Sequence, residues 1–221
     1  MADKNKVYAY FDGSNFYHLS KKNFGFSDID FNKLSNSLLK HENEELIKIK
    51  YFNSPLNQQE EPEEYAKQLK FFEAIKKTPL LEVHLGRLVK RPLNKINILC
   101  KECGLRQVNT LYCPNCGKPV DINRTYKSTE KGTDISIALN LIIDALNNNY
   151  ETALLFSGDA DFAPAMNYLK NFLKKEIIYC RFPKPKTSEL LQTASSTRLI
   201  TKDIMEKSRL EKTIKQKNEK F

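Results

Sequence analysis

Glycine and histidine are scarce in this chain, and their scarcity argues against several kinds of active site. Only 7 of the 221 residues are glycine, and neither a P-loop nor a Gly-x-Gly-x-x-Gly loop occurs, which disfavours a nucleotide cofactor. The three histidines, His18, His41 and His84, form no His-x3-His pair, which argues against a histidine-based zinc hydrolase. No Gly-x-Ser-x-Gly elbow is present either.

Long apolar runs are also missing. No stretch approaches the ~20 apolar residues that a membrane-spanning helix needs. The first residues, Met-Ala-Asp-Lys-Asn-Lys, do not resemble a signal peptide. We therefore expect a cytoplasmic protein with no membrane partner. In that reducing compartment the five cysteines favour metal binding over disulfides.

Positive charge is in excess. The chain has 36 Lys and Arg against 27 Asp and Glu, a formal net charge of +9. The excess is concentrated between Arg87 and Lys131, a segment with ten basic and three acidic residues. A basic surface of this kind favours a polyanionic partner without identifying it.

Short apolar runs of strand length alternate with segments of helical periodicity. This alternation predicts an α/β fold with a mostly parallel central sheet and helices on both faces. Residues 91–127 break the pattern and are interpreted as an insertion, and residues 202–221 as a basic C-terminal tail. The expected strands are 7–11, 47–52, 81–88, 152–156, 177–181 and 198–201, and the expected helices are 30–40, 62–77, 135–146 and 164–174.

Acidic residues follow two of the expected strands. Asp12 comes after the first strand, and Asp159 and Asp161 come after strand 152–156, while Asp134 begins helix 135–146. Ligands of open parallel sheets bind beyond the carboxyl ends of the strands. Four carboxylates at one place repel one another unless a cation neutralises them, and Mg²⁺ or Mn²⁺ prefers such oxygen ligands. The alternative for each aspartate is a plain turn former or helix cap.

Four cysteines inside the insertion form two pairs with metal-ligand spacing. Cys100-x2-Cys103 and Cys113-x2-Cys116 are each followed by glycine, which permits the tight turn of a zinc knuckle. Four thiolates predict a closed, structural zinc site, with an iron site or adventitious disulfides as alternatives. The basic residues and tyrosines around this zinc ribbon favour binding of single-stranded RNA. The alternative is a basic, solvated insertion whose tyrosines pack locally.

Three short blocks resemble the signature of the NYN domain family, which belongs to the PIN-like nucleases. They are Phe11-Asp12-Gly13-Ser14-Asn15-Phe16, Lys131-Gly132-Thr133-Asp134 and Ser157-Gly158-Asp159-Ala160-Asp161-Phe162. The resemblance implies a PIN-like domain at 6–90 and 128–201, interrupted by the insertion. It also implies a Mg²⁺- or Mn²⁺-dependent ribonuclease. Asp12, Asp134 and Asp159 would be metal ligands, Asp161 a fourth acidic residue, and Asn15 a group that positions substrate.

Several basic residues are candidates for contact with RNA phosphates: Lys131, Arg91, Arg124, Lys127, Lys184 and Lys186. For Lys131 the alternative is a solvated lysine at a helix start. The favoured function is a metal-dependent ribonuclease in which the zinc ribbon helps to hold RNA. The alternatives are a non-catalytic RNA-binding or scaffold protein, and a DNA nuclease or phosphatase that uses the same carboxylates. The sequence leaves open whether the chain forms a homo-oligomer.

Overall fold

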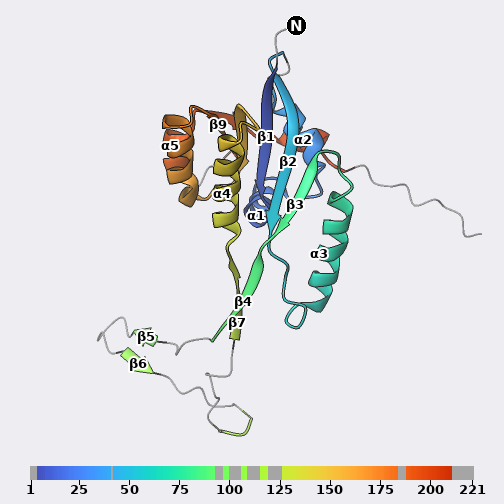
Figure 1. Cartoon of the computed structure of the whole chain (residues 1–221). Helices are drawn as coiled ribbons and strands as arrows, with labels where there is room; N and C mark the ends of the chain where they lie inside the picture. Colours follow the sequence, from blue (N-terminus) through green and yellow to red (C-terminus); the bar gives the residue numbers. More distant parts are fainter. Residues whose placement is uncertain are drawn as a thin grey trace, which may run out of the picture.

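A computed structural model of the chain describes residues 4–40, 42–92, 97–99, 106–108, 115–118, 126–183 and 188–210. Its core is a six-stranded sheet in the order β10-β9-β8-β1-β2-β3, in which every neighbouring pair is parallel (Figure 1). The predicted parallel sheet is therefore confirmed. Its strands are β1 (Asn5–Asp12), β2 (Glu44–Asn53), β3 (Leu81–Leu85), β8 (Thr152–Phe156), β9 (Glu176–Arg181) and β10 (Ser196–Leu199).

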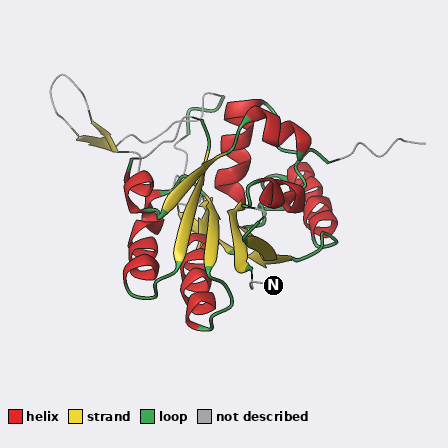
Figure 2. Ribbon diagram, turned by 90° about the horizontal axis from the view of Figure 1, so that it is seen from above, coloured by secondary structure: helices red, strands yellow, loops and turns green. Residues whose placement is uncertain are grey.

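Helices cover both faces of the sheet, as the sequence predicts (Figure 2). Two clusters of buried apolar side chains fill the space between the sheet and the helices. The first cluster lies under α1 (Gly13–Phe24), α2 (Phe31–Ser37), α3 (Pro62–Ile75) and α7 (Lys202–Lys207). The second lies under α4 (Thr133–Leu146), α5 (Ala163–Asn171) and α6 (Glu189–Thr193). Within the described residues, no helix is both long and apolar enough to cross a membrane.

Strand β1 lies inside the sheet and is covered on both faces. Val7, Ala9 and Phe11 belong to the first apolar cluster, and Tyr8 and Tyr10 belong to the second. A strand that is covered on both faces has a nearly continuous apolar sequence instead of an alternating one. This property makes β1 recognisable from the sequence alone.

Two helices on the first face differ in how well the sequence predicts them. Asp30 caps α2 as its position suggests, because its Oδ1 accepts the backbone N–H groups of Asn32 and Lys33 at 2.9 and 3.0 Å. By contrast, α1 is not expected from the sequence, and neither is α6 on the other face. The apolar residues that α1 buries are Phe16 and Leu19, which is too few to give a clear helical period.

The single strand expected over residues 81–88 is two strands in the structure. β3 ends at Leu85 and β4 (Arg87–Pro92) begins after Gly86. At Gly86 the chain passes so close to its neighbours that a Cβ atom would lie 2.4 Å from Ser54 Oγ and 2.6 Å from Thr133 Oγ1. The glycine therefore lets the chain leave the parallel sheet beside the start of α4.

The predicted insertion leaves the core through a two-stranded antiparallel arm. β4 pairs with β7 (Tyr126–Lys131), from Arg87 opposite Lys131 to Pro92 opposite Tyr126. Figure 1 shows this arm extending away from the sheet. Beyond the arm, β5 (Asn97–Leu99) pairs antiparallel with β6 (Arg106–Val108).

The apolar spacing that predicts α4 marks its outer face and not its inner one. Ile137 and Leu141 face the sheet and are buried. The helical spacing of Ile135, Leu139, Ile142 and Leu146 predicts the helix, but Ile135, Leu139 and Leu146 are exposed. α4 has apolar residues around most of its circumference, so apolar spacing alone does not determine which face is buried. A polar contact determines how the helix is rotated about its axis.

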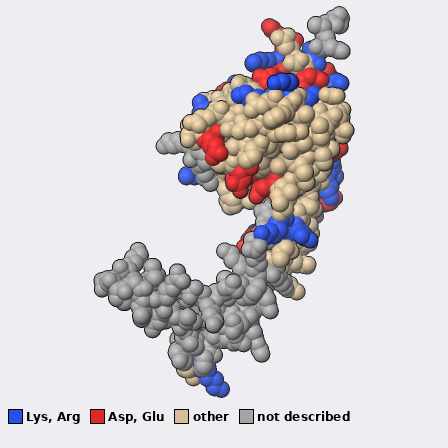
Figure 3. Space-filling view, turned by 60° about the vertical axis from the view of Figure 1, so that its left-hand side comes forward, with Lys and Arg blue, Asp and Glu red and all other residues tan. Residues whose placement is uncertain are grey.

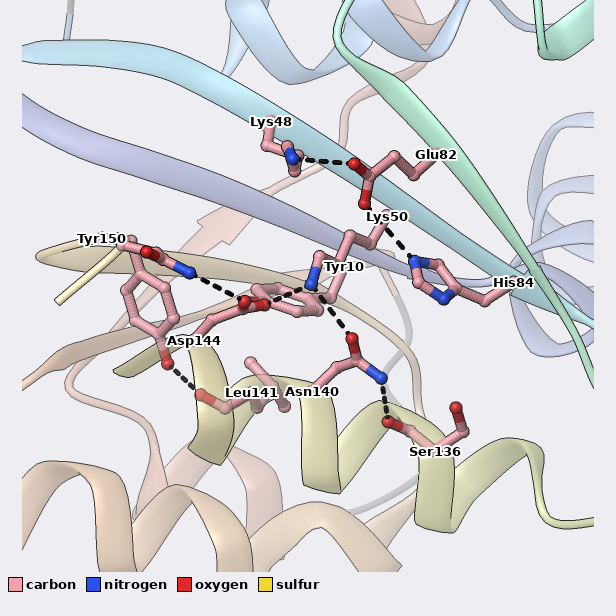
Figure 4. A network of polar contacts seen from close by, with 11 residues as sticks. Tyr10, Lys48, Lys50, Glu82, His84, Ser136, Asn140, Leu141, Asp144 and Tyr150 are labelled. Atoms are coloured by element: carbon pink, nitrogen blue, oxygen red, sulfur yellow. Dashed lines mark hydrogen bonds and ion pairs between the residues drawn. The ribbon is translucent and has the colours of Figure 1, made fainter. Parts of the chain in front are cut away.

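That polar contact is a buried ion pair between α4 and β2 (Figure 4). Lys50 Nζ lies 2.6 Å from Asp144 Oδ2, and the Tyr10 hydroxyl donates a hydrogen bond of 2.7 Å to the same oxygen. Lys50 also donates to Asn140 Oδ1, and Asn149 donates to Asp144 Oδ1. Burial raises the pKa of the Tyr10 hydroxyl, which keeps it protonated and able to donate. Since Asp144 must face Lys50, the aliphatic stripe of α4 turns outward.

The first part of the expected C-terminal tail is packed on the core. Met205 in α7 is buried, and the Asp30 N–H donates to the Ser208 carbonyl at 2.8 Å. Ile29 and Arg209 form an antiparallel bridge beside this contact. Residues 202–210 therefore belong to the folded domain, and residues 211–221 lie outside the described part of the chain.

Candidate functional site

The strand order gives the sheet one switch point, between β1 and β8. The chain proceeds from β1 to β2 on one side, whereas the later strands β8, β9 and β10 lie on the other side. In open parallel sheets, ligands bind outside the carboxyl ends of the strands at such a point. Asp12 is the last residue of β1, and Ser157, Gly158 and Asp159 directly follow β8. The structure thus brings two of the three predicted acidic segments to adjacent strand ends.

Asp12 is held by both of its carboxylate oxygens. Its Oδ1 accepts the backbone N–H of Asn15 at 3.1 Å, which makes Asp12 the N-cap of α1. Its Oδ2 accepts a hydrogen bond of 2.8 Å from the hydroxyl of Ser157, across the gap between β1 and β8. The residue is only 5% exposed. Asp12 is therefore a buried carboxylate with a fixed orientation at the switch point.

A second set of hydrogen bonds joins the two strand ends. Asn15 Oδ1 accepts the N–H of Gly158 at 2.9 Å, and the N–H of Asp159 donates to Ser157 Oγ at 3.2 Å. Asp159 in turn caps the short 3-10 helix η2 (Ala160–Phe162), because its Oδ1 accepts the N–H of Asp161 at 3.0 Å. Asp159 is half-buried and Asp161 is exposed. The loop after β8 is thus tied to the beginning of α1.

The start of α4 comes from a different part of the chain. Thr133 is buried, and its hydroxyl lies 3.1 Å from that of Ser54, just beyond the end of β2. Asp134 follows in the first turn of the helix and is exposed. A negative side chain at this position is favoured by the helix dipole. α4 also packs against η2, which carries Asp161.

Gly13 permits close contact between α1 and β2. A Cβ atom there would lie 2.4 Å from the ring of Tyr51 and 2.8 Å from the carbonyl oxygen of Phe52. Neither the packed ring nor the backbone can easily move away. The glycine after Asp12 is therefore needed for α1 to begin directly at the end of β1.

The donor set of the site consists of oxygen atoms, which is the chemistry that a hard divalent cation requires. Asp12 and Asp159 lie on adjacent strand ends and share Ser157 as a hydrogen-bond partner. Among the described residues, no group of three or more His, Cys, Asp or Glu side chains is arranged to hold a metal ion. Mg²⁺ is often held by one or two protein carboxylates, with water and substrate phosphate as the other ligands. The residues present therefore fit such an ion.

The comparisons with known proteins agree with this geometry. The NYN domain profile matches residues 6–203, which is nearly the whole chain. The chain belongs to the NYN domain family. The fold is also similar to the crystal structure of a protein of unknown function from Vibrio parahaemolyticus RIMD 2210633, with a TM-score of 0.60 and 18% sequence identity. That match covers 92% of this chain and 97% of the other. No curated protein matches the chain in sequence.

Several predicted RNA contacts of this NYN domain lie on the arm. Lys131 is exposed at the end of β7, opposite Arg87. Figure 3 shows Lys and Arg side chains gathered where the arm leaves the core, and Asp and Glu side chains on the core surface nearby. Arg91 and Lys127 are opposite each other in the β4–β7 ladder. The remaining predicted contacts lie outside the described residues: Arg124, Lys184 and Lys186.

The predicted zinc ligands lie mostly outside the described residues of the NYN domain. Cys116 is described and exposed, whereas Cys100, Cys103 and Cys113 are not described. The fifth cysteine, Cys180, is buried in β9, and burial raises the pKa of its thiol. Cys180 therefore behaves as a small apolar core residue, as its strand position suggests.

Three hydroxyl residues of the site were not expected from the sequence: Ser157, Thr133 and Ser54. Ser157 is part of a signature block, but its partner Asp12 is 145 residues away in the chain. Ser54 and Thr133 likewise meet only in the folded chain, where 79 residues separate them. Only knowledge of the strand order could have revealed these pairs.

Proposed function

We propose that this NYN domain is a metal-dependent ribonuclease that hydrolyses RNA phosphodiester bonds at the switch point between β1 and β8. The observation that carries the proposal is the hydrogen-bond chain from Asp12 through Ser157 to the Asp159 backbone. It holds one carboxylate in a fixed orientation beside a second at the edge where parallel sheets bind ligands. The family membership supports the same activity, because the NYN domain is a nuclease-type domain.

Four acidic residues are proposed to hold Mg²⁺ or Mn²⁺: Asp12, Asp134, Asp159 and, directly or through water, Asp161. When bound, such an ion makes a coordinated water more acidic and stabilises negative charge on a phosphodiester. Two of these carboxylates, Asp12 and Asp159, already accept hydrogen bonds that hold them in place. The fixed positions of Asp12 and Asp159 reduce the reorganisation that ion binding would otherwise require.

The chain's own polar groups are proposed to position the RNA. Asn15 accepts the Gly158 N–H through Oδ1, so its Nδ2 is the atom assigned to a phosphate oxygen. A carboxylate of the set takes the proton from the attacking water. Lys131 is assigned to a phosphate beside the site, because it is exposed one residue before the turn that starts α4. These groups bind and orient the substrate, which accounts for much of phosphodiester catalysis.

The insertion is proposed to be a zinc ribbon that helps to hold RNA. The antiparallel pairing of β5 and β6 supports it, because Cys100 and Cys103 lie in sequence between these two strands. Zinc bound by Cys100, Cys103, Cys113 and Cys116 would be structural, since four thiolates leave no coordination position for water. The RNA contacts proposed for this region are Arg91, Arg124 and Lys127, with Lys184 and Lys186 from the loop after β9.

Metal-dependent cleavage tests the proposed activity. The purified full chain is incubated with labelled single-stranded and structured RNAs, with single-stranded DNA and with a small phosphate ester. We expect cleavage of RNA with Mn²⁺ or Mg²⁺ and none with EDTA. Asp159→Asn should lower the rate at least about 100-fold, because it removes a charge that the metal requires. The matched control is Asp203→Asn, an exposed aspartate of α7.

The same experiment separates the proposal from its main alternative. RNA that binds but is not cleaved with either metal would contradict the ribonuclease and favour a non-catalytic RNA-binding domain. Preferential cleavage of DNA or of the phosphate ester would support the carboxylate site as the site of hydrolysis but would contradict RNA as its substrate.

Zinc content tests the ribbon separately from the nuclease site. We expect one zinc ion per chain by elemental analysis after purification without added metal. Cys100→Ser should lower this content strongly, because the loss of one thiolate opens a closed tetrahedral site. Cys180→Ser is the matched control, since this cysteine is buried in β9. Full zinc content in Cys100→Ser would contradict the proposed ligand set.

A further inference from the structure

The outer face of α4 is entirely aliphatic beyond its first turn. After Asp134, the residues of this helix that are exposed are Ile135, Leu139, Ile143 and Leu146. The helix has one other charged residue, Asp144, and that side chain is buried against Lys50. Surface helices of globular proteins normally carry polar or charged side chains opposite their buried face. This helix carries none there, along about 17 Å from Ile135 to Leu146.

Helix α5 extends this aliphatic face with two aromatic side chains. Tyr168 and Phe172 are exposed, and their rings stack with centroids 5.4 Å apart. α5 packs between α4 and α6. Lys170 donates to the carbonyls of Thr193 and Ala194, so its side of α5 faces α6. Tyr168 and Phe172 are one turn apart on the other side of α5, toward α4. α4 and α5 lie side by side in Figure 1, and Figure 3 shows a broad surface without charged side chains.

Six exposed side chains form the α4–α5 patch: Ile135, Leu139, Ile143, Leu146, Tyr168 and Phe172. Their exposed fractions range from 41% to 73%. Side chains of this size present about 100–120 Å² each at such exposure, or roughly 600–700 Å² together, which exceeds the largest apolar patch of a typical monomer. A patch of this size on a soluble domain marks an interaction surface.

We infer that the α4–α5 patch is the interface through which two copies of this chain form a symmetric dimer. Two facing patches would bury on the order of 1,200 Å² in total from these side chains alone, which is above the ~1,000 Å² that a specific interface requires. A two-fold interface places the same patch on both partners. A face without charge suits this arrangement, since no like charges are brought together.

The C-terminal segment 211–221 is a poorer occupant of the patch than a second copy. The longest segment outside the described residues is 211–221, which has six charged residues and only Ile214 and Phe221 as large apolar side chains. Burying that segment on an uncharged surface would desolvate several charges without partners. A second copy of the same patch carries no such cost.

Sedimentation of the full chain over a range of micromolar concentrations tests the dimer. We expect a monomer–dimer equilibrium for the natural sequence. Leu139→Glu and Ile143→Glu should each raise the dissociation constant at least about tenfold, because a central apolar residue is replaced by a charge that meets its own copy. The control is Leu69→Glu, an exposed leucine on α3, which covers the opposite face of the sheet (Figure 1). It should leave the dissociation constant unchanged.

Thermal unfolding of each variant shows whether loss of the dimer is specific. Leu139→Glu and Ile143→Glu are expected to stay folded because both side chains are exposed. If either does not fold, the double variant Ile135→Gln with Leu146→Gln tests the same patch with uncharged residues. A natural chain that is monomeric at all concentrations would overturn the inference. So would a dimer that the patch variants and Leu69→Glu affect equally.

Discussion

Asp12→Asn is expected to lower metal-dependent RNA cleavage at least about 100-fold while leaving the fold intact. Asparagine is as good an N-cap as aspartate, so the hydrogen bond from the Asn15 N–H and the start of α1 should persist. What the substitution removes is the negative charge that a divalent cation needs at the end of β1. The rate is measured with saturating Mn²⁺ and labelled RNA.

The chain contains a matched control for this substitution. Asp30 caps α2 through its side chain just as Asp12 caps α1, but among the described residues its side chain accepts hydrogen bonds within α2 and not from the loop after β8. Asp30→Asn should therefore preserve the cleavage rate. Ser157→Ala should lower the rate about 10- to 100-fold, because Asp12 then loses the hydroxyl that orients its Oδ2. Equal rates for Asp12→Asn and Asp30→Asn would exclude the proposed role of Asp12.

Breaking the buried ion pair between β2 and α4 is expected to destabilise the domain strongly. Lys50→Met leaves the carboxylate of Asp144 buried without its cation and should lower the free energy of unfolding by about 3–5 kcal/mol. The Tyr10 hydroxyl still donates to Asp144, but a neutral donor does not balance the charge. Denaturant unfolding followed by circular dichroism gives the value.

Strand β2 supplies an exposed ion pair for comparison. Lys48 lies 2.7 Å from Glu82 on β3, and both side chains are partly solvated. Lys48→Met should cost less than about 1 kcal/mol, because water screens and replaces this pair. The double variant Lys50→Met with Asp144→Leu should recover most of the loss, since no buried charge remains. If Lys50→Met costs no more than Lys48→Met, the buried pair does not hold α4 in place.

The sheet was predictable because most of its strands are covered on both faces. β1 and β8 are short, nearly continuous apolar runs, and such runs are identifiable without any knowledge of their neighbours. Helix α1 was not predictable in the same way. It buries few apolar residues and begins at Asp12-Gly13, which also fits a simple turn.

The candidate site was predictable only in part. The positions of Asp12 and Asp159 after strands follow from the pattern of the chain, and the structure places them at adjacent strand ends. The role of Ser157 depends on β8 being the neighbour of β1, and periodicity does not determine strand order. The outward face of α4 could not be predicted either, because the partner of Asp144 is a lysine 94 residues earlier.

The hydrogen bond between Ser157 and Asp12 has a consequence for biosynthesis. The two residues are 145 positions apart, so Asp12 leaves the ribosome long before its partner has been made. Until then β1 also lacks β8, its neighbour on one side of the sheet. Contacts of such long sequence separation form late and slowly in folding. A nascent chain shorter than about 160 residues therefore carries only one half of the site, and its function can begin only after the second half has joined the sheet.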